Sequence, residues 1–145
     1  FMVLKKLLIS LKKFVIKMKI FGNGVDIVNN FRIKKSIKNG KFVKRIFSIG
    51  EIKDSEKVTN KASFFAKRFA AKEAFAKSLG TGITKGINFK DISIRNNKFG
   101  KPEIHLNNKV KSILKKHHKL KNFKIFLSLA DEKNHSIAFV ILNKL

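Results

Sequence analysis

The chain has 145 residues, no cysteine and a formal net charge of +25. This length suits a single domain, and the lack of cysteine excludes disulfide frameworks and thiolate chemistry, as expected of a protein from the reducing cytoplasm. The charge predicts an anionic partner, for which nucleic acid, a membrane surface, an acidic protein and a phosphorylated small molecule are all candidates. The histidines lack the spacing of zinc ligands, so no zinc site is expected.

Residues 1–18 are predicted to form a basic amphipathic extension ahead of a domain that covers residues 19–145. Leucines recur there at helical spacing, with lysines between them, at Leu4, Leu7, Leu8 and Leu11. The segment carries too much charge to span a bilayer, so no stable membrane insertion is expected, and no signal-peptide cleavage site follows it. It either touches a membrane surface or is an upstream extension ahead of Met18, and we favour the second interpretation.

A glycine-rich strand that carries one acid is predicted over residues 19–27. Alternation puts Gly22, Gly24 and Asp26 on one side, where the glycines leave room for a ligand or a backbone segment to approach closely. The alternative is a twisted strand with a bulge, in which Asp26 caps the following helix.

Three helices are predicted after this strand. The first is short and covers residues 29–37, and a Ser-x-x-Glu capping box at residues 48–51 begins the second. Asp54 or Ser55 is expected to cap a third, long helix that runs to about Leu79.

The long helix is the segment in which chemistry is most expected. It is rich in alanine and lysine, and the turn Gly80-Thr81-Gly82 ends it. Glu73 falls on a stripe that is otherwise apolar, made of Ala62, Ala66, Phe69 and Ala76. A carboxylate there needs a metal, a base or a donor network as its partner, unless it merely lies at the edge of a core-facing helix. The Gly-Thr-Gly turn is either a helix C-cap or a set of N–H donors for phosphate.

Two hairpins complete the chain. Residues 87–95 and 103–106 flank a turn, and residues 123–129 and 136–142 flank another, with a short basic helix over residues 109–116 between the hairpins. This order of elements predicts an α+β fold in which an antiparallel sheet packs on one long helix.

Four segments resemble motifs of the holo-acyl-carrier-protein synthases, the small class of 4′-phosphopantetheinyl transferases. Gly22–Val28 is similar to the G-x-G-x-D-[IL] strand of that family, and Arg68–Ile83 matches its long R-F-A-A-K-E-A helix motif. Gly100–Pro102 and Leu127–Leu129 match a later turn and a later strand. The segments follow the family's order, and the similarity spans about residues 20–142, so the resemblance implies the phosphopantetheinyl transferase fold.

The resemblance implies transfer of 4′-phosphopantetheine from coenzyme A to a serine of apo acyl carrier protein for fatty acid biosynthesis, with release of adenosine 3′,5′-bisphosphate. Asp26 and Glu73 match the family's Mg²⁺ ligands, and this hard cation prefers carboxylate and phosphate oxygens. The ion would bridge the pyrophosphate of coenzyme A and offset charge on the leaving phosphate. The nucleophile belongs to the carrier protein, and its proton goes either to water at the metal or to Glu73 itself.

The resemblance also implies a coenzyme A site made of Arg68, Lys72, Lys77, Gly80, Thr81, Gly82 and Ser128. Lys77 follows Glu73 by four residues on nearly the same face, so it is expected to reach a phosphate at the metal and to take part in catalysis. Lys72 points elsewhere and is expected to contact another phosphate or a neighbouring subunit. Ser128 is expected to line the same pocket, although not as a nucleophile, because no histidine base is in view.

An acidic carrier protein would be steered by a basic surface. Arg32 and Arg45 are expected to meet this partner, unless they are ordinary surface arginines. A homotrimer with sites between subunits is implied by the resemblance alone. Asp131 stands where the family usually has a histidine, which is expected to weaken coenzyme A binding unless Asp131 faces the metal or turns away, and His135 is a candidate substitute.

Two other functions fit the sequence less well. A nucleic-acid-binding module would need exposed aromatic residues among its basic ones, but the phenylalanines lie at core-like spacing and tyrosine and tryptophan are absent, so no nucleic acid partner is expected. An inactive relative kept for membrane or partner binding would explain the basic N-terminal segment and Asp131. The presence of both Asp26 and Glu73 argues against it.

Overall fold

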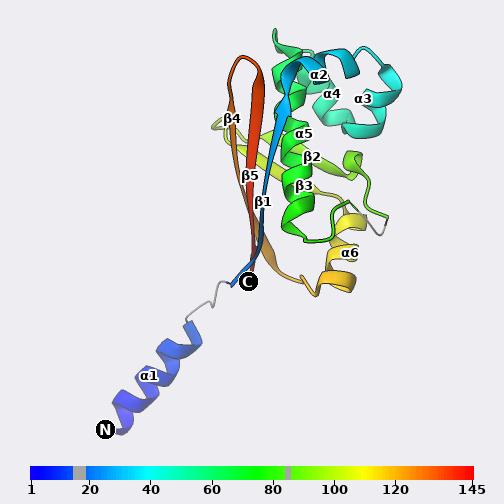
Figure 1. Ribbon diagram of the computed structural model, residues 1–145. Coiled ribbons are helices and arrows are strands. Elements are labelled where there is room, and N and C mark those ends of the chain that lie inside the picture. The colour runs from blue at the N-terminus through cyan, green and yellow to red at the C-terminus, as the bar shows by residue number, and fades with distance from the viewer. Residues whose placement is uncertain (15–18, 84–85) are drawn as a thin grey trace.

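The computed structural model describes residues 1–14, 19–83 and 86–145, which form helices and two antiparallel sheets (Figure 1). In chain order the elements are α1 (Met2–Phe14), β1 (Lys19–Asn29), α2 (Asn30–Ser36), α3 (Gly40–Ile46), α4 (Ile49–Ser55), α5 (Lys61–Ser78), the 3₁₀ turn η1 (Phe89–Asp91), β2 (Ile92–Asn96), β3 (Pro102–Leu106), α6 (Asn108–His118), β4 (Phe123–Asp131) and β5 (His135–Lys144).

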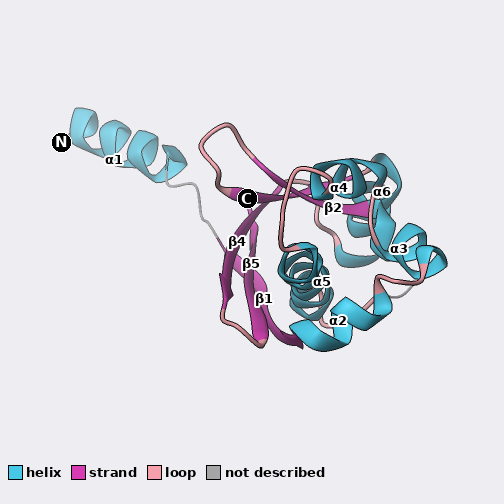
Figure 2. Ribbon diagram, turned by 90° about the horizontal axis from the view of Figure 1, so that it is seen from above, coloured by secondary structure: helices cyan, strands magenta, loops and turns pink. Residues whose placement is uncertain are grey.

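The main sheet has the strand order β1-β5-β4 and is antiparallel throughout. The long helix α5 packs along one face of this sheet, and α2 lies on the same side (Figure 2). Strands β2 and β3 pair as a separate hairpin, in which β3 lies next to β4 of the main sheet and β2 contacts α4 and α5. The predicted α+β fold, with an antiparallel sheet on one long helix, is confirmed.

The start of α5 lies later than predicted. Asn60 caps the helix, because its side chain accepts a hydrogen bond from the N–H of Ser63 at 3.0 Å. Asp54 and Ser55 belong instead to the last turn of α4. That shorter helix begins with the predicted capping box at residues 48–51, in which both reciprocal hydrogen bonds form.

Strand β1 and helix α5 touch through their backbones. A Cβ atom added to Gly24 would collide with the carbonyl oxygen of Ala74, and one added to Gly22 would collide with that of Ser78. The close approach that the glycines predict is therefore made by the backbone of α5, and it brings the side chain of Asp26, two residues further along β1, against the helix.

The opposite face of the main sheet carries exposed apolar side chains. They share one side of the pleat, with exposed fractions between 37% and 61%, and are Val25, Ile27, Phe126, Ile137 and Phe139. We call this set the bare face. Helices α2 and α5, which pack on the sheet, lie on its other side (Figure 2).

The helix predicted from the leucine spacing is present as α1, and its apolar residues up to Leu8 are exposed. Within residues 1–14, 19–83 and 86–145, no helix is both long enough and apolar enough to cross a bilayer. Met18, the start considered for the domain, lies outside the described residues.

Candidate active site

Asp26 and Lys77 form an ion pair between β1 and α5. The Lys77 ammonium donates to Oδ1 of Asp26 at 2.8 Å and to the carbonyl oxygen of Val25 at 3.0 Å. The side chain of Asp26 is 16% exposed, whereas that of Lys77 is 54% exposed. The structure thus brings two of the predicted site residues into direct contact. Asp26 is the more buried member of the pair, and Lys77 covers it from the solvent side.

Glu73 lies one helical turn before Lys77, half-buried beside the same strand. Burial raises the pKa of its carboxyl group, and the nearby charge of Asp26 raises it further, whereas Lys77 and Arg32 lower it. Among the residues that the structure describes, the Glu73 carboxylate has no ion-pair partner. Two carboxylates therefore share one small region with two cations beside them.

Arg32 reaches this region because α2 follows β1 directly. Asn29 caps α2, since its side-chain oxygen accepts the N–H of Arg32 at 3.0 Å. Asp26 is thus not the cap of the next helix, and its carboxylate remains available to the site. Arg32 itself is exposed, and its charge acts on Glu73.

The pair Asp26 and Glu73 suits a magnesium ion better than a zinc ion. In the described part of the chain, no group of three or more His, Cys, Asp or Glu side chains lies together. Zinc sites need three or four protein ligands, whereas Mg²⁺ is commonly held by one or two carboxylates together with water and substrate phosphate.

Lys72 is not at the surface, contrary to the role predicted for it. Its side chain is fully buried, and its ammonium donates to a carboxylate oxygen of Glu51 at 2.7 Å and to the carbonyl oxygens of Ile46 and Phe89 at 2.8 and 3.0 Å. Burial lowers the pKa of Lys72, and Glu51 opposes that shift. A lysine so enclosed has no path to a phosphate or to a neighbouring subunit.

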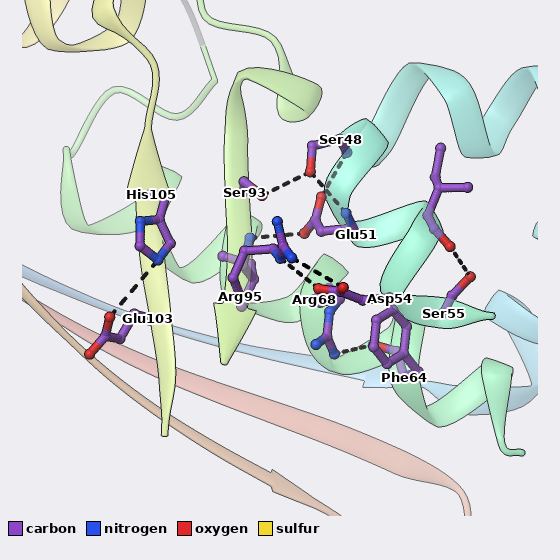
Figure 3. Close-up of polar contacts among 12 residues, drawn as sticks. Ser48, Glu51, Asp54, Ser55, Phe64, Arg68, Ser93, Arg95, Glu103 and His105 are labelled. Atoms are coloured by element: carbon purple, nitrogen blue, oxygen red, sulfur yellow. Dashed lines mark hydrogen bonds and ion pairs between the residues drawn. The ribbon is translucent and has the colours of Figure 1, made fainter. Parts of the chain in front are cut away.

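Glu51 completes this buried network. It accepts the backbone N–H of Ser48 at 2.7 Å (Figure 3). It also accepts the backbone N–H of Ile94 at 3.0 Å, in addition to the ammonium of Lys72. The network ties α4, α5, η1 and β2 together. Its members are paired and buried, so its role is to hold the helices in place.

Arg68 lies on the other flank of α5, away from Asp26. Its guanidinium stacks on the ring of Phe64 at 3.3 Å and donates to the Phe64 carbonyl oxygen, while its buried Nε has no hydrogen-bond partner in the described part of the chain (Figure 3). Burial lowers the pKa of Arg68 to about 10. The side chain lines an open pocket of about 560 Å³ between the start of α5, the β2–β3 hairpin and β4.

Asp131 faces α5 from the end of β4 and lines the same pocket as Arg68. It accepts a hydrogen bond from the Ser63 hydroxyl at 2.7 Å and pairs with Lys67 at 3.0 Å. These two contacts lower the pKa of Asp131. Asp131 therefore turns away from Asp26 and Glu73, and its charge is offset by Lys67. His135 pairs with Asn29 in the sheet and does not line this pocket, so it does not replace a histidine there.

The other predicted residues lie outside the carboxylate region. Ser128 points to the bare face of the sheet, opposite the side on which Asp26 lies, so the two do not line one pocket within one chain. Leu79 is the C-cap of α5, and Gly80 follows it with a φ of +74° and donates its N–H to the Lys77 carbonyl oxygen at 3.0 Å. Thr81 and Gly82 follow at the surface end of α5. Arg45 is exposed on α3.

The sequence interpretation missed the partners Ser63 and Lys67, because contacts between α5 and β4 depend on tertiary packing. Glu51 was found as a capping residue, but its pairing with Lys72 was not. The alternation of Leu127 and Leu129 around Ser128 did contain a signal, since flanking half-buried leucines indicate that the serine points the other way.

Comparison with known proteins places this site in a family. Residues 22–140 match the family profile of the 4′-phosphopantetheinyl transferase superfamily. The chain is 56% identical to the holo-[acyl-carrier-protein] synthase of Pelagibacter ubique over 127 residues, which cover 88% of this chain and 99% of that protein.

Solved structures agree with this match. The holo-[acyl-carrier-protein] synthase of Neisseria meningitidis superposes with a TM-score of 0.78 at 36% identity, covering 87% of this chain and 100% of that one. The synthase of Bacillus anthracis, solved in complex with CoA (3′,5′-ADP), superposes with a TM-score of 0.73 at 33% identity, covering 87% of this chain and 98% of that one. The chain therefore belongs to the 4′-phosphopantetheinyl transferase superfamily, and it is an enzyme of that family.

Proposed function

We propose that this enzyme transfers 4′-phosphopantetheine from coenzyme A to a serine of apo acyl carrier protein, using Mg²⁺, and that it does so in the cytoplasm for fatty acid biosynthesis. The observation that carries the proposal is the meeting of Asp26 and Glu73 beside Lys77, inside the segment that matches the family. Relatives named for this reaction, and a neighbour solved with coenzyme A, support the choice of substrates.

In this proposal Asp26 and Glu73 would hold Mg²⁺, which supplies a positive charge that draws the pyrophosphate of coenzyme A into place and stabilises the leaving phosphate. Lys77 and Arg32 add positive charge at the edge of the same region. Half-burial of Glu73 excludes part of the solvent and strengthens these interactions.

The reaction exchanges one phosphorus–oxygen bond for another. The serine oxygen of the carrier bonds to the β-phosphorus of coenzyme A, and the bond from that phosphorus to the bridging oxygen breaks, so adenosine 3′,5′-bisphosphate leaves with the electron pair. The serine proton goes to water or to a carboxylate oxygen of Glu73.

The carrier protein is proposed to dock on α2 and α3. From Ile27 to Gly50 the chain has no Asp or Glu, and its basic side chains are all exposed: Arg32, Lys34, Lys35, Lys38, Lys41, Lys44 and Arg45. This basic surface begins beside the carboxylates, because Arg32 acts on Glu73. An acidic carrier would be attracted to it and brought towards the site.

The enzyme is further proposed to be a homotrimer with sites between subunits, as the family resemblance suggests. The bare face supports an assembly, since five exposed apolar side chains lie together on one sheet. The separation of the predicted residues supports a shared site. Asp26, Glu73 and Lys77 lie on one flank of α5, Arg68 lies on the other, and Ser128 lies on the bare face. In a trimer, Arg68 and Ser128 of a neighbouring copy would lie beside Asp26, Glu73 and Lys77 of this one.

Mass spectrometry of apo acyl carrier protein tests the proposed function. Incubation with the enzyme, coenzyme A and Mg²⁺ should add one phosphopantetheine group to the carrier. The addition should disappear with Glu73→Ala and when a chelator removes the metal. A wild-type enzyme that binds coenzyme A but leaves the carrier mass unchanged would rule out the transfer reaction.

A further inference from the structure

Lys77 contacts the carboxylate of Asp26, the group that would hold a metal ion in the proposed function. Its ammonium lies 2.8 Å from Oδ1 of Asp26 and 3.0 Å from the carbonyl oxygen of Val25. A divalent cation bound to the same carboxylate would be repelled by an ammonium this close to it, because the two positive charges would lie only a few ångströms apart. This repulsion favours displacement of Lys77 when Asp26 binds a metal ion.

The side chain of Lys77 is free to change its conformation. More than half of it is exposed, so its ammonium has open solvent beside it into which it can turn away from Asp26. Lys72, five residues earlier on the same helix, shows the contrast. It is fully buried and held by three acceptors, so it cannot leave its place.

We propose that Lys77 competes with the divalent cation for Asp26 and is transferred to a phosphate of coenzyme A when the cation and coenzyme A bind together. This inference rests on the proposed function and adds a rule for the order of binding. A cation that binds alone must displace the Lys77 ammonium from Asp26 and is then repelled by it. When coenzyme A binds as well, its phosphate gives the ammonium a new anionic partner. Binding of the cation and binding of coenzyme A therefore strengthen each other.

The electrostatic balance of the site agrees with this exchange. Asp26 and Glu73 lie close enough to repel, and Lys77 and Arg32 offset that repulsion. A divalent ion between the carboxylates would itself offset their repulsion, so Lys77 would no longer be needed beside Asp26. The freed ammonium would then lie beside the phosphate oxygens that the ion draws in.

Titration with Mn²⁺ tests the proposal, because free Mn²⁺ is measured directly by its electron paramagnetic resonance signal. Without coenzyme A, Lys77→Met should bind Mn²⁺ about three- to tenfold more tightly than the wild type, since the competing charge is gone. With Mn²⁺ present, the same variant should bind coenzyme A about tenfold more weakly, since the phosphate loses a charged donor. A purely structural role would not produce effects of opposite sign.

Lys109 provides a matched control. It pairs with Asp91 at 3.4 Å, and the two side chains are 51% and 13% exposed, close to the 54% and 16% of Lys77 and Asp26. Lys109→Met should therefore match the wild type in both titrations. Lys77→Gln should behave as Lys77→Met, which guards against a packing effect of methionine, and thermal melting will verify that each variant folds.

The outcomes separate this inference from the proposed function. If wild type and Lys77→Met bind Mn²⁺ equally, or the variant binds it more weakly, Lys77 does not compete and the inference is wrong, whatever the carrier assay shows. If neither protein binds Mn²⁺ at millimolar concentration while coenzyme A binds, both the inference and the proposed metal requirement are wrong. Phosphopantetheine transfer remains a separate result in the mass-spectrometric assay.

Discussion

Gly24 of β1 rests directly on the carbonyl oxygen of Ala74 in α5, with no room for a methyl group between them. This contact sets the distance between the strand that carries Asp26 and the helix that carries Glu73. The spacing of the two carboxylates is therefore fixed by backbone packing rather than by side-chain contacts.

Gly24→Ala is expected to separate β1 from α5. The added methyl group would collide with backbone atoms that cannot rotate away, so the free energy of unfolding should fall by about 1–3 kcal/mol. Displacement of Asp26 by about 1 Å should lower phosphopantetheine transfer by roughly 100-fold. Urea unfolding and the carrier assay measure the two effects. Gly40→Ala is the control, since a Cβ at Gly40 meets nothing within 4 Å, and equal losses in both variants would contradict the argument.

Lys72→Met is expected to destabilise the fold by about 3–5 kcal/mol, because it leaves the buried Glu51 carboxylate without its cation. Adding Glu51→Gln should recover part of this loss, since the neutral amide no longer needs a cation and its oxygen can still accept a backbone N–H. Denaturant unfolding of the single and double variants measures the difference. Lys67→Met, at a partly exposed pair, should cost no more than about 1 kcal/mol. A double variant less stable than Lys72→Met would refute this account.

Asp131 should stabilise the fold in a pH-dependent way. Its native pKa lies below its ordinary value because of Ser63 and Lys67. The stabilisation is therefore complete above the unfolded-state pKa of about 3.9, and it is lost as the pH falls through the lower native pKa. At pH 7 the melting temperature of the wild type should be higher than that of Asp131→Asn. The difference between the two melting temperatures should disappear as the pH falls below about 4. A difference that stays constant down to pH 2 would contradict the assignment.

Ile27→Glu should break the proposed assembly, because it puts a charge on the bare face. Sedimentation equilibrium should show a smaller species, and transfer activity should fall with it if the site lies between subunits. Ile49 is a matched control, since it is an exposed isoleucine on α4, 88% exposed against 61% for Ile27. Ile49→Glu should leave the mass of the assembly unchanged. A wild-type enzyme that sediments as a monomer would overturn the trimer proposal directly.

The sequence was sufficient for the parts of the site that follow from local rules. Glycine alternation in β1 predicted a close approach at Asp26, and helical spacing predicted that Glu73 and Lys77 lie on one side of α5. Both rules depend only on the repeat of a strand or helix, so they hold once the element forms.

Other parts depend on packing between distant segments. Helical spacing alone does not show whether Lys72 lies at the surface or in the core. It is buried because α4 and η1 pack over it. Asp131 likewise takes its role from Ser63 and Lys67, which lie far away along the chain. The side of the sheet on which Ser128 points depends on strand register, where a shift of one residue reverses every side chain.

Lys72 and Glu73 are neighbours in sequence with opposite surroundings, one enclosed in the core and the other beside the surface carboxylate of Asp26. Successive residues of a helix differ by about 100° around its axis. A single-residue insertion or deletion between Lys61 and Lys72 would therefore rotate both out of place, leaving an acid in the core or a lysine at the carboxylate site. Length variation is expected to be tolerated in the loop before Asn60 and not within the first three turns of α5, which can be tested by scanning one-residue insertions through both segments.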